Sequence, residues 1–319
     1  MKPHNPIFLL TKKDGNPSSA LLHLFQALNL STVNLKQMTE DLHKYYMRKP
    51  GIDRWQMQEV PFQKDKILPF LKKLGFVEEI LPSKETSTSP HYIFIHGGHV
   101  EKMQSRINFF NTKIWPNLSK ETQEKGHIIF LTGDRKLNIE TSEKENLLNP
   151  NPSQIPIREG WIPPQVPPLN ESDAARIIWD QLILNETLRN KILFIDAPCP
   201  QDYHRPTTKD TLTAWLTSFQ QFQKKPSFLP LSYQTFWKNA PDIKKSSFLV
   251  ISNNPFILYQ DLVFRNFLQE KGLGNVYLET VGSKANDNVL LAVYLDNLAR
   301  TLLEIQKFLQ QKKFFSFLS

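Results

Sequence analysis

Five short runs of consecutive apolar residues occur in the chain after residue 90. They occupy residues 92–95, 128–131, 192–195, 248–251 and 276–281. Runs of Ile, Val, Phe and Leu without polar alternation are typical of strands buried on both faces. Most of these runs are followed by a turn and then by a segment with helical apolar spacing. This order predicts an α/β fold with about five parallel strands joined by right-handed crossovers.

Helical spacing predicts further elements between and before these strands. Between and after the strands, we expect helices near residues 101–115, 171–184, 208–222, 260–270 and 289–309. In the first ninety residues, apolar stripes predict helices at 20–28, 35–46 and 65–74. Gly75 suits the C-cap of the last of these, although Pro69 interrupts it. The polar stretch 83–90 predicts a linker between a mainly helical region, 1–90, and an α/β domain, 91–319.

Two connections are longer than a crossover requires. Residues 136–169 form a proline-rich insertion, and residues 224–245 form a second insertion with several aromatic side chains. Long structured loops in compact domains are often functional, for example as lids. Packing over a helix face explains such insertions equally well, so both interpretations stay open.

Composition narrows the class of protein. Of the 319 residues, 40% are hydrophobic and 22% charged, which is enough apolar material for a buried core. The N-terminus has four consecutive apolar residues, too few for a signal peptide, and no stretch approaches the roughly 20 needed to span a membrane. Cys199 is the single cysteine, so no intrachain disulfide can form. We expect a cytoplasmic protein, with secretion by a non-classical route left open.

The formal net charge of +8 is spread along the chain, without a block of five like charges. A dispersed basic surface does not favour nucleic-acid binding, which typically uses clustered Lys and Arg. An anionic small molecule is the partner that we expect instead.

Polar, turn-forming clusters follow the predicted strands. Ligands in open α/β sheets bind beyond the carboxyl ends of the strands. The clusters are His96-Gly97-Gly98-His99, Thr132-Gly133-Asp134-Arg135, Asp196-Ala197-Pro198 with the later Arg205-Pro206-Thr207-Thr208-Lys209-Asp210, Ser252-Asn253-Asn254-Pro255, and Gly282-Ser283-Lys284. Their convergence predicts a ligand site at this edge of the sheet.

The cluster His96-Gly97-Gly98-His99 lies between a strand and a helix. Glycines let the backbone approach a ligand, and free N–H groups at a helix start attract anions. The chain lacks the full dinucleotide-binding glycine pattern, the phosphate-binding loop and the Gly-x-Ser-x-Gly elbow of lipase-like hydrolases. His96 and His99 with Asp134 suggest a metal site, but shaping a tight turn is the better explanation, and we predict no metal.

Three other groups have a structural and a functional interpretation. Arg135 can clamp a phosphate or carboxylate, or can pair with an acid to tie two loops together. Glu171 opens a helix, where an acid favours the helix dipole, and we also assign it to ligand binding. Thr207 and Asp210 fit an N-cap and capping box, whereas the same helix start, with Arg205 and Thr208, forms an anion site. Cys199 carries no feature of a nucleophile.

The motifs together resemble the bacterial SanA/YdcF-like family. The residues that carry the resemblance are Gly97-Gly98, Arg106, Thr132-Gly133-Asp134, Glu171-Ser172-Asp173-Ala174, Thr207-Thr208-Lys209-Asp210-Thr211, Ser252-Asn253-Asn254-Pro255 and Arg265. Asp134 replaces a glycine of the family pattern, Pro255 or Phe256 falls where the family has histidine, and the family's common membrane anchor is missing. The resemblance implies a Rossmann-like three-layer sandwich with a polar pocket at the strand ends. At least one member of the family binds S-adenosylmethionine.

The strand-end clusters support two functional hypotheses. The first is a hydrolase-type enzyme for a nucleotide-like or phosphorylated ligand, in which His96, His99 and Asp134 perform acid–base chemistry. Its ligand-binding residues would be Gly97, Gly98, Arg106, Gly133, Arg135, Glu171, Arg205, Thr207, Thr208, Asp210, Ser252, Asn253 and Asn254. The second is a non-catalytic module that binds a nucleotide or S-adenosylmethionine, with residues 1–90 contacting a protein partner. The sequence does not specify a cofactor.

Overall fold

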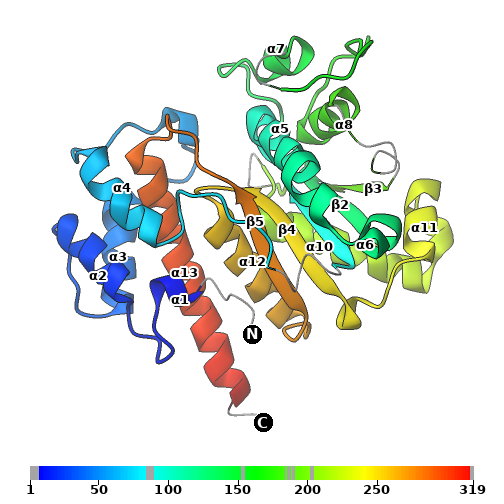
Figure 1. Ribbon diagram of the computed structural model, residues 1–319. Helices are drawn as coiled ribbons and strands as arrows, with labels where there is room; N and C mark the ends of the chain where they lie inside the picture. Colours follow the sequence, from blue (N-terminus) through cyan, green and yellow to red (C-terminus); the bar gives the residue numbers. More distant parts are fainter. Residues whose placement is uncertain are drawn as a thin grey trace. The chain divides into compact units, whose positions relative to one another are not determined.

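Each of the five apolar runs forms a strand in the computed structural model of the chain (Figure 1). The structure describes residues 7–83, 90–151, 155–182, 184, 188, 191–201 and 205–316, so residues 84–89 of the predicted linker lie outside it. The strands are β1 (Tyr92–His96), β2 (His127–Gly133), β3 (Ile192–Ala197), β4 (Ser247–Asn253) and β5 (Tyr277–Ser283).

These strands form one parallel sheet in the order β3-β2-β1-β4-β5. The order 3-2-1-4-5 is that of a doubly wound Rossmann-like sheet, in which the direction of strand addition reverses between β1 and β4. Phe94 in β1 pairs with Ile129 in β2 on one side and with Val250 in β4 on the other. The predicted α/β fold with five parallel strands is therefore confirmed.

Helices bury the faces of this sheet (Figure 1). The helices α5 (Val100–Phe109) and α8 (Glu171–Gln181) pack against each other and against the strands β1, β2 and β3. Helix α10 (Thr208–Lys224) places Trp215 against Phe94 and Phe248, with ring centroids 4.9 and 5.8 Å away. Because every side chain of β1 is buried, the continuous apolar run matches its surroundings on both faces.

Several helical predictions need adjustment. The segment predicted as one helix at 101–115 continues beyond α5 as a π-helical turn, Phe110–Ile114, and a 3-10 turn, Trp115–Asn117. Within the described residues, four short α-helices were also not predicted, namely α1 (Ile7–Leu10), α6 (Lys120–Lys125), α7 (Glu143–Leu148) and α11 (Leu231–Lys238). Elements of eight residues or fewer span too few turns for a helical period to stand out. The helices α7 and α11 lie in the two insertions.

The three predicted N-terminal helices are present. They are α2 (Ser19–Ala27), α3 (Leu35–Tyr46) and α4 (Lys64–Lys73). The side chains of Ser18 and Asn34 cap the first two by accepting backbone N–H groups. Helix α4 continues through Pro69 to Lys73 and is capped by Leu74; Gly75 follows, and its φ of +83° suits a residue without a Cβ atom.

The chain forms two compact units that do not follow a linear division at residue 90. The sheet unit comprises Leu81–Ser252 and Asn275–Gly282, and the helical unit comprises Met1–Ile80, Asn253–Gly274 and Ser283–Ser319. The helices α12 (Ile257–Glu270) and α13 (Leu291–Ser316) thus belong with the N-terminal helices. The reason lies in α13, which buries an apolar stripe in the core of the helical unit: Leu291, Leu295, Leu298, Leu302 and Ile305.

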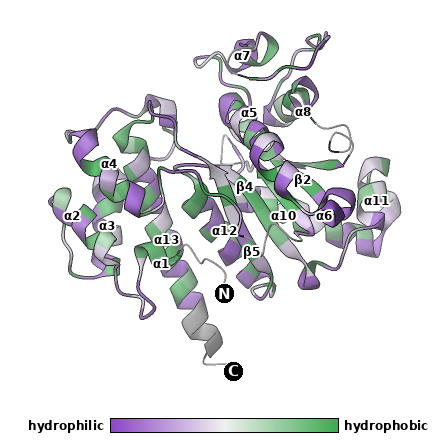
Figure 2. Ribbon diagram, in the orientation of Figure 1, coloured by the Kyte–Doolittle hydropathy of each residue, from purple (hydrophilic) through white to green (hydrophobic). Residues whose placement is uncertain are grey.

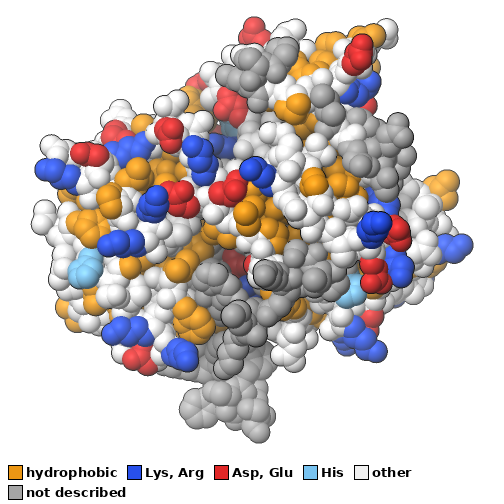
Figure 3. Space-filling view, in the orientation of Figure 1, with side chains coloured by type: hydrophobic (Ala, Val, Ile, Leu, Met, Phe, Trp, Pro, Cys, Tyr) orange, Lys and Arg blue, Asp and Glu red, His pale blue; other side chains and the backbone are white. Residues whose placement is uncertain are grey.

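The surface of the molecule is mixed in character. The helices carry both hydrophobic and hydrophilic positions in Figure 2. On the face drawn in Figure 3, basic side chains lie interspersed with acidic ones. Among the described residues, no helix combines the length and the apolar composition that crossing a bilayer requires.

The aromatic contacts of Phe94 generate a stability prediction. Replacing Phe94, which is fully buried, with alanine should lower the free energy of unfolding by about 3–5 kcal/mol, because a cavity replaces the ring between Trp215 and Phe248. Urea denaturation measures this change. Ile139→Ala, at a side chain that is 91% exposed, should change stability by no more than about 0.5 kcal/mol. Equal effects of the two substitutions would contradict the described packing.

Candidate functional site

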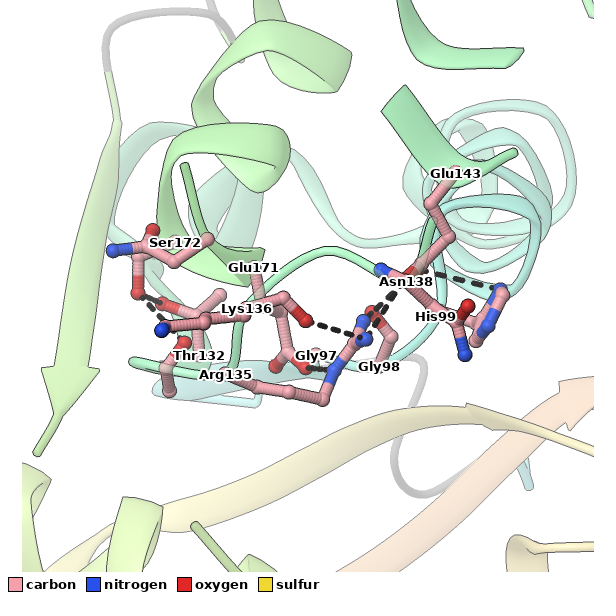
Figure 4. A network of polar contacts seen from close by, with 12 residues as sticks. Gly97, Gly98, His99, Thr132, Arg135, Lys136, Asn138, Glu143, Glu171 and Ser172 are labelled. Atoms are coloured by element: carbon pink, nitrogen blue, oxygen red, sulfur yellow. Dashed lines mark hydrogen bonds and ion pairs between the residues drawn. The ribbon is translucent and has the colours of Figure 1, made fainter. Parts of the chain in front are cut away.

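The guanidinium of Arg135, just after β2, lies at the centre of a buried polar network (Figure 4). Its Nη1 and Nη2 atoms donate to the two carboxylate oxygens of Glu143 at 2.7 and 2.9 Å. Its Nε donates to Glu171 at 3.1 Å, and Nη2 also donates to the carbonyl oxygen of Gly98. One arginine therefore connects the ends of β1 and β2, the start of α8 and helix α7 of the first insertion.

Glu143 holds this insertion to the sheet unit. Its carboxylate accepts the backbone N–H groups of Val100 at 2.9 Å and Asn138 at 2.7 Å, in addition to Arg135. At the base of the insertion, Lys136 forms an antiparallel bridge with Asn170. The two ends of residues 136–169 are thus adjacent, and Glu143 fixes α7 over the β1 and β2 loops.

The network contains two buried glutamates, one buried arginine, Arg106, and one largely buried arginine, Arg135. Glu143 and Glu171 are 1% and 8% exposed, and Arg106 is 3% exposed. Burial alone raises the pKa of Glu143, but the hydrogen bonds and charge of Arg135 outweigh it, so the net shift is downward. Burial raises the pKa of Glu171. The charges of Arg135 and Arg106 offset this effect only in part, so the net shift is upward. Burial also lowers the pKa of Arg106 to about 10.

The glycine loop is shaped from within the protein. Arg106 in α5 donates to the carbonyl oxygens of His96, at 2.8 Å, and Gly97. A Cβ atom on Gly97 would collide with a carboxylate oxygen of Glu171 and would lie 2.7 Å from the backbone oxygen of Leu131. The close approach that favours glycine at this position therefore involves Glu171 and β2.

The two histidines of the loop have different environments. His96 is 2% exposed, and its Nε2 atom has no hydrogen-bond partner among the described residues. Burial, with a smaller contribution from the charge of Arg106, lowers the pKa of His96 to about 3, so the imidazole is neutral near pH 7. The side chain of His99 is one-third exposed, with Nδ1 3.3 Å from Glu143 and Nε2 3.2 Å from the hydroxyl of Thr141.

Side chains of the protein itself occupy the N-termini of α5, α8 and α10, and the sequence offered the first and the last of these for anion binding. Glu143 accepts the first N–H of α5, and Asn170 accepts the N–H of Asp173 in α8. At α10, Thr207 and Asp210 form a reciprocal capping box, as the sequence predicted. Since these caps use donors that an anion would need, the helix starts are poorer anion sites than isolated ones.

A pocket of about 280 Å³ opens at the carboxyl ends of β2 and β3. Its lining, which we call the carboxylate pocket, is Asp134, Asn170, Ser172, Asp173, Arg176, Asp196, Ala197 and Pro198. Asp134 accepts from the Asn170 amide at 2.8 Å, and Asp173 accepts the N–H of Leu169 at 2.9 Å. Asp196 pairs with Arg176 at 2.5 Å and accepts from Thr132 at 3.1 Å.

The structure gathers some of the predicted site residues and separates others. Around Arg135 it gathers Gly97, Gly98, His99, Arg106 and Glu171, with His96 and Gly133 at the adjoining strand ends. Asp134 lies in the carboxylate pocket. Thr207, Thr208 and Asp210 start α10, and Arg205 lies in the loop before it. Ser252 is fully buried in β4, whereas Asn253 and Asn254 belong to the helical unit.

The sequence had no feature that singled out Glu143, nor Asn170 and Arg176 of the pocket lining, and of that lining only Asp134 was assigned a role. No motif marks Glu143, which lies in an acidic stretch of the insertion with Glu140 and Glu145 nearby. Asp196 and Asp173 stood next to predicted site residues, but only their side-chain direction makes them pocket residues. Within the described part of the chain, no three His, Cys, Asp or Glu side chains gather as metal ligands would.

The buried network predicts a large cost for removing Arg135. Arg135→Met should lower the free energy of unfolding by about 3–5 kcal/mol, because two buried carboxylates lose their partner. Arg158→Met is the matched control: Arg158 pairs with both oxygens of Asp180 on the surface, and its loss should cost about 0–1 kcal/mol. Chemical denaturation distinguishes the two, and similar costs would contradict the central role of Arg135.

His96 predicts a specific pH dependence of stability. The unfolded chain protonates this imidazole near pH 6.5, whereas the folded chain does so only near pH 3. Lowering the pH between these values therefore favours unfolding, by up to about 1.4 kcal/mol per pH unit. His96→Asn should flatten the plot of unfolding free energy against pH over this range. Parallel plots for the wild type and His96→Asn would refute the assignment.

No protein-family model, curated protein or solved structure matches the chain, so the geometry of the strand ends is the basis for assigning its function.

Proposed function

We propose that the carboxylate pocket binds a small, hydroxyl-rich ligand without a phosphate group, either cationic, as S-adenosylmethionine is, or neutral, as a nucleoside is. The observation that carries the proposal is the charge of the lining. Three carboxylates and one guanidinium give a net charge of −2. Arg176 already pairs with Asp196, so the excess negative charge rests on Asp134 and Asp173.

Hydrogen-bonding capacity supports the same ligand class. The described contacts of Asp134 and Asp173 each come from one neutral donor, an amide of Asn170 and the N–H of Leu169. A carboxylate has lone pairs for further donors, such as ribose hydroxyls or an amino group. Acidic residues near strand ends bind ribose in dinucleotide-binding Rossmann folds. The resemblance to a family with a member that binds S-adenosylmethionine agrees with this choice.

Hydrolysis of an anionic ligand has weaker support. A phosphate in this pocket would face Asp134 and Asp173, while Arg135 is already committed to Glu143 and Glu171. The neutral, buried His96 is a poor acid–base group near pH 7. Acid–base chemistry inside the pocket would fall to Asp134 or Asp173. The binding module is therefore the function that we favour.

Ligand-induced thermal stabilisation tests the proposal. S-adenosylmethionine or adenosine should stabilise the protein, by about 2.7 kcal/mol at a concentration of 100 times Kd, whereas AMP and inorganic phosphate should stabilise it less. The double variant Asp134→Asn/Asp173→Asn should lose the effect. Glu121→Gln, at an exposed carboxylate of α6, serves as the control and should keep it.

Two results would count against the proposal. One is stabilisation by AMP or phosphate that exceeds stabilisation by adenosine, because this order would require a positively charged site. The other is equal ligand stabilisation of the wild type and the double variant, because the ligand would then bind elsewhere.

A further inference from the structure

The imidazole of His99 lies between the carboxylate of Glu143 and the hydroxyl of Thr141, outside the carboxylate pocket. Glu143 lies 3.3 Å from Nδ1 of His99, and Nε2 of the same ring lies 3.2 Å from the hydroxyl oxygen of Thr141. None of the three residues lines the pocket. Figure 4 draws the link between Glu143 and His99. The sequence alone gave no reason to connect Thr141 with His99, which lies 42 positions away.

The carboxylate determines how the imidazole is used. When ionised, Glu143 has only acceptor oxygens. The Nδ1 atom of His99 that faces it therefore carries the ring hydrogen. In the neutral ring, Nε2 then carries the lone pair and accepts from the hydroxyl of Thr141. This is the order of acid, base and hydroxyl that activates a nucleophile in hydrolases with catalytic triads.

The three side chains differ in solvent exposure in the way such a group requires. Glu143 is 1% exposed and is fixed by Arg135 and by the N–H of Asn138. His99 is one-third exposed and Thr141 is half-buried, so a small molecule can reach both. The Asn138 side chain accepts the N–H of Thr141 at 3.1 Å and so fixes the turn that presents the hydroxyl.

We propose that Thr141 is a catalytic nucleophile for small acyl esters, with His99 as general base and Glu143 as a positioning residue. This activity goes beyond ligand binding in the carboxylate pocket and does not depend on it. Because Arg135 also claims the carboxylate of Glu143, the histidine gains less basicity than it would from an unshared acid. We therefore expect slow turnover.

The reaction balances with water as the co-reactant. The hydroxyl oxygen of Thr141 attacks the ester carbonyl carbon while His99 Nε2 takes the hydroxyl proton. The tetrahedral intermediate collapses, the bond to the alcohol oxygen breaks, and His99 returns the proton to the departing alcohol. Water then attacks the acyl-threonine with His99 again as base, which releases the carboxylic acid and restores Thr141.

Hydrolysis of p-nitrophenyl acetate by the full chain tests the proposal. The wild type should exceed the buffer rate, and Thr141→Val or His99→Gln should lower the enzymatic rate by about 100-fold or more. Thr141→Ser keeps a hydroxyl and should stay within about tenfold of the wild type. The matched controls Thr213→Val and His91→Gln change exposed side chains of the sheet unit and should leave the rate unchanged.

Mass spectrometry and a pH profile separate catalysis from a purely structural role. The acetyl group should appear on Thr141 during turnover, and the pH dependence that a general base gives to the rate should be lost in His99→Gln. A wild-type rate equal to that of buffer overturns the proposal. Full activity in folded Thr141→Val, or acetylation confined to other residues, also overturns it.

Discussion

The pairing of Arg135 with Glu143 and Glu171 is the interaction on which the strand-end region depends. Arg135 follows β2, Glu171 begins α8, and Glu143 begins α7 in the first insertion. Buried charges are costly unless they are paired, so none of these three groups tolerates separation from the others. The network thereby fixes the glycine loop after β1 and anchors α7 of the first insertion. An insertion that the sequence left open as lid or packing element is bound to the sheet unit through one guanidinium.

This network also reverses the electrostatics expected from the sequence. Arg135 lies close to predicted anion-binding glycines, and helix starts lie at the same edge of the sheet. Yet Glu143, Asn170 and Asp210 occupy the donors that an anion would use. The neighbouring carboxylate pocket is lined by three carboxylates and one guanidinium. This charge favours a cationic or hydroxylated ligand over the anionic ligand expected from the sequence.

The sheet could be predicted because strands buried on both faces are continuous apolar runs, as in residues 92–95 and 248–251. The capping box at the start of α10 could also be predicted, since Thr207 and Asp210 lie three positions apart in the sequence. Contacts between distant segments could not be. Glu143 lies 43 positions from Val100 and no local motif marks it. The apolar stripe of α13 predicts a buried face but does not specify that this face packs against the N-terminal helices.

Arg135 shows most clearly what could not be predicted from the sequence alone. The sequence allowed either an anion clamp or an ion pair between loops, and the structure supplies two glutamates as partners. To decide between these alternatives one must know which acidic side chains the fold brings close to Arg135. Spacing along the chain does not give this information. The same holds for Thr141, which becomes interesting only when His99 and Glu143 are seen beside it.

A crystal structure of the protein grown with S-adenosylmethionine tests directly whether the carboxylate pocket binds this ligand. We predict ligand density in the carboxylate pocket, with ribose hydroxyls or the amino group within hydrogen-bond distance of Asp134 or Asp173. Ligand density elsewhere with this pocket empty, or a ligand phosphate bound in the pocket of a parallel crystal grown with AMP, would contradict it.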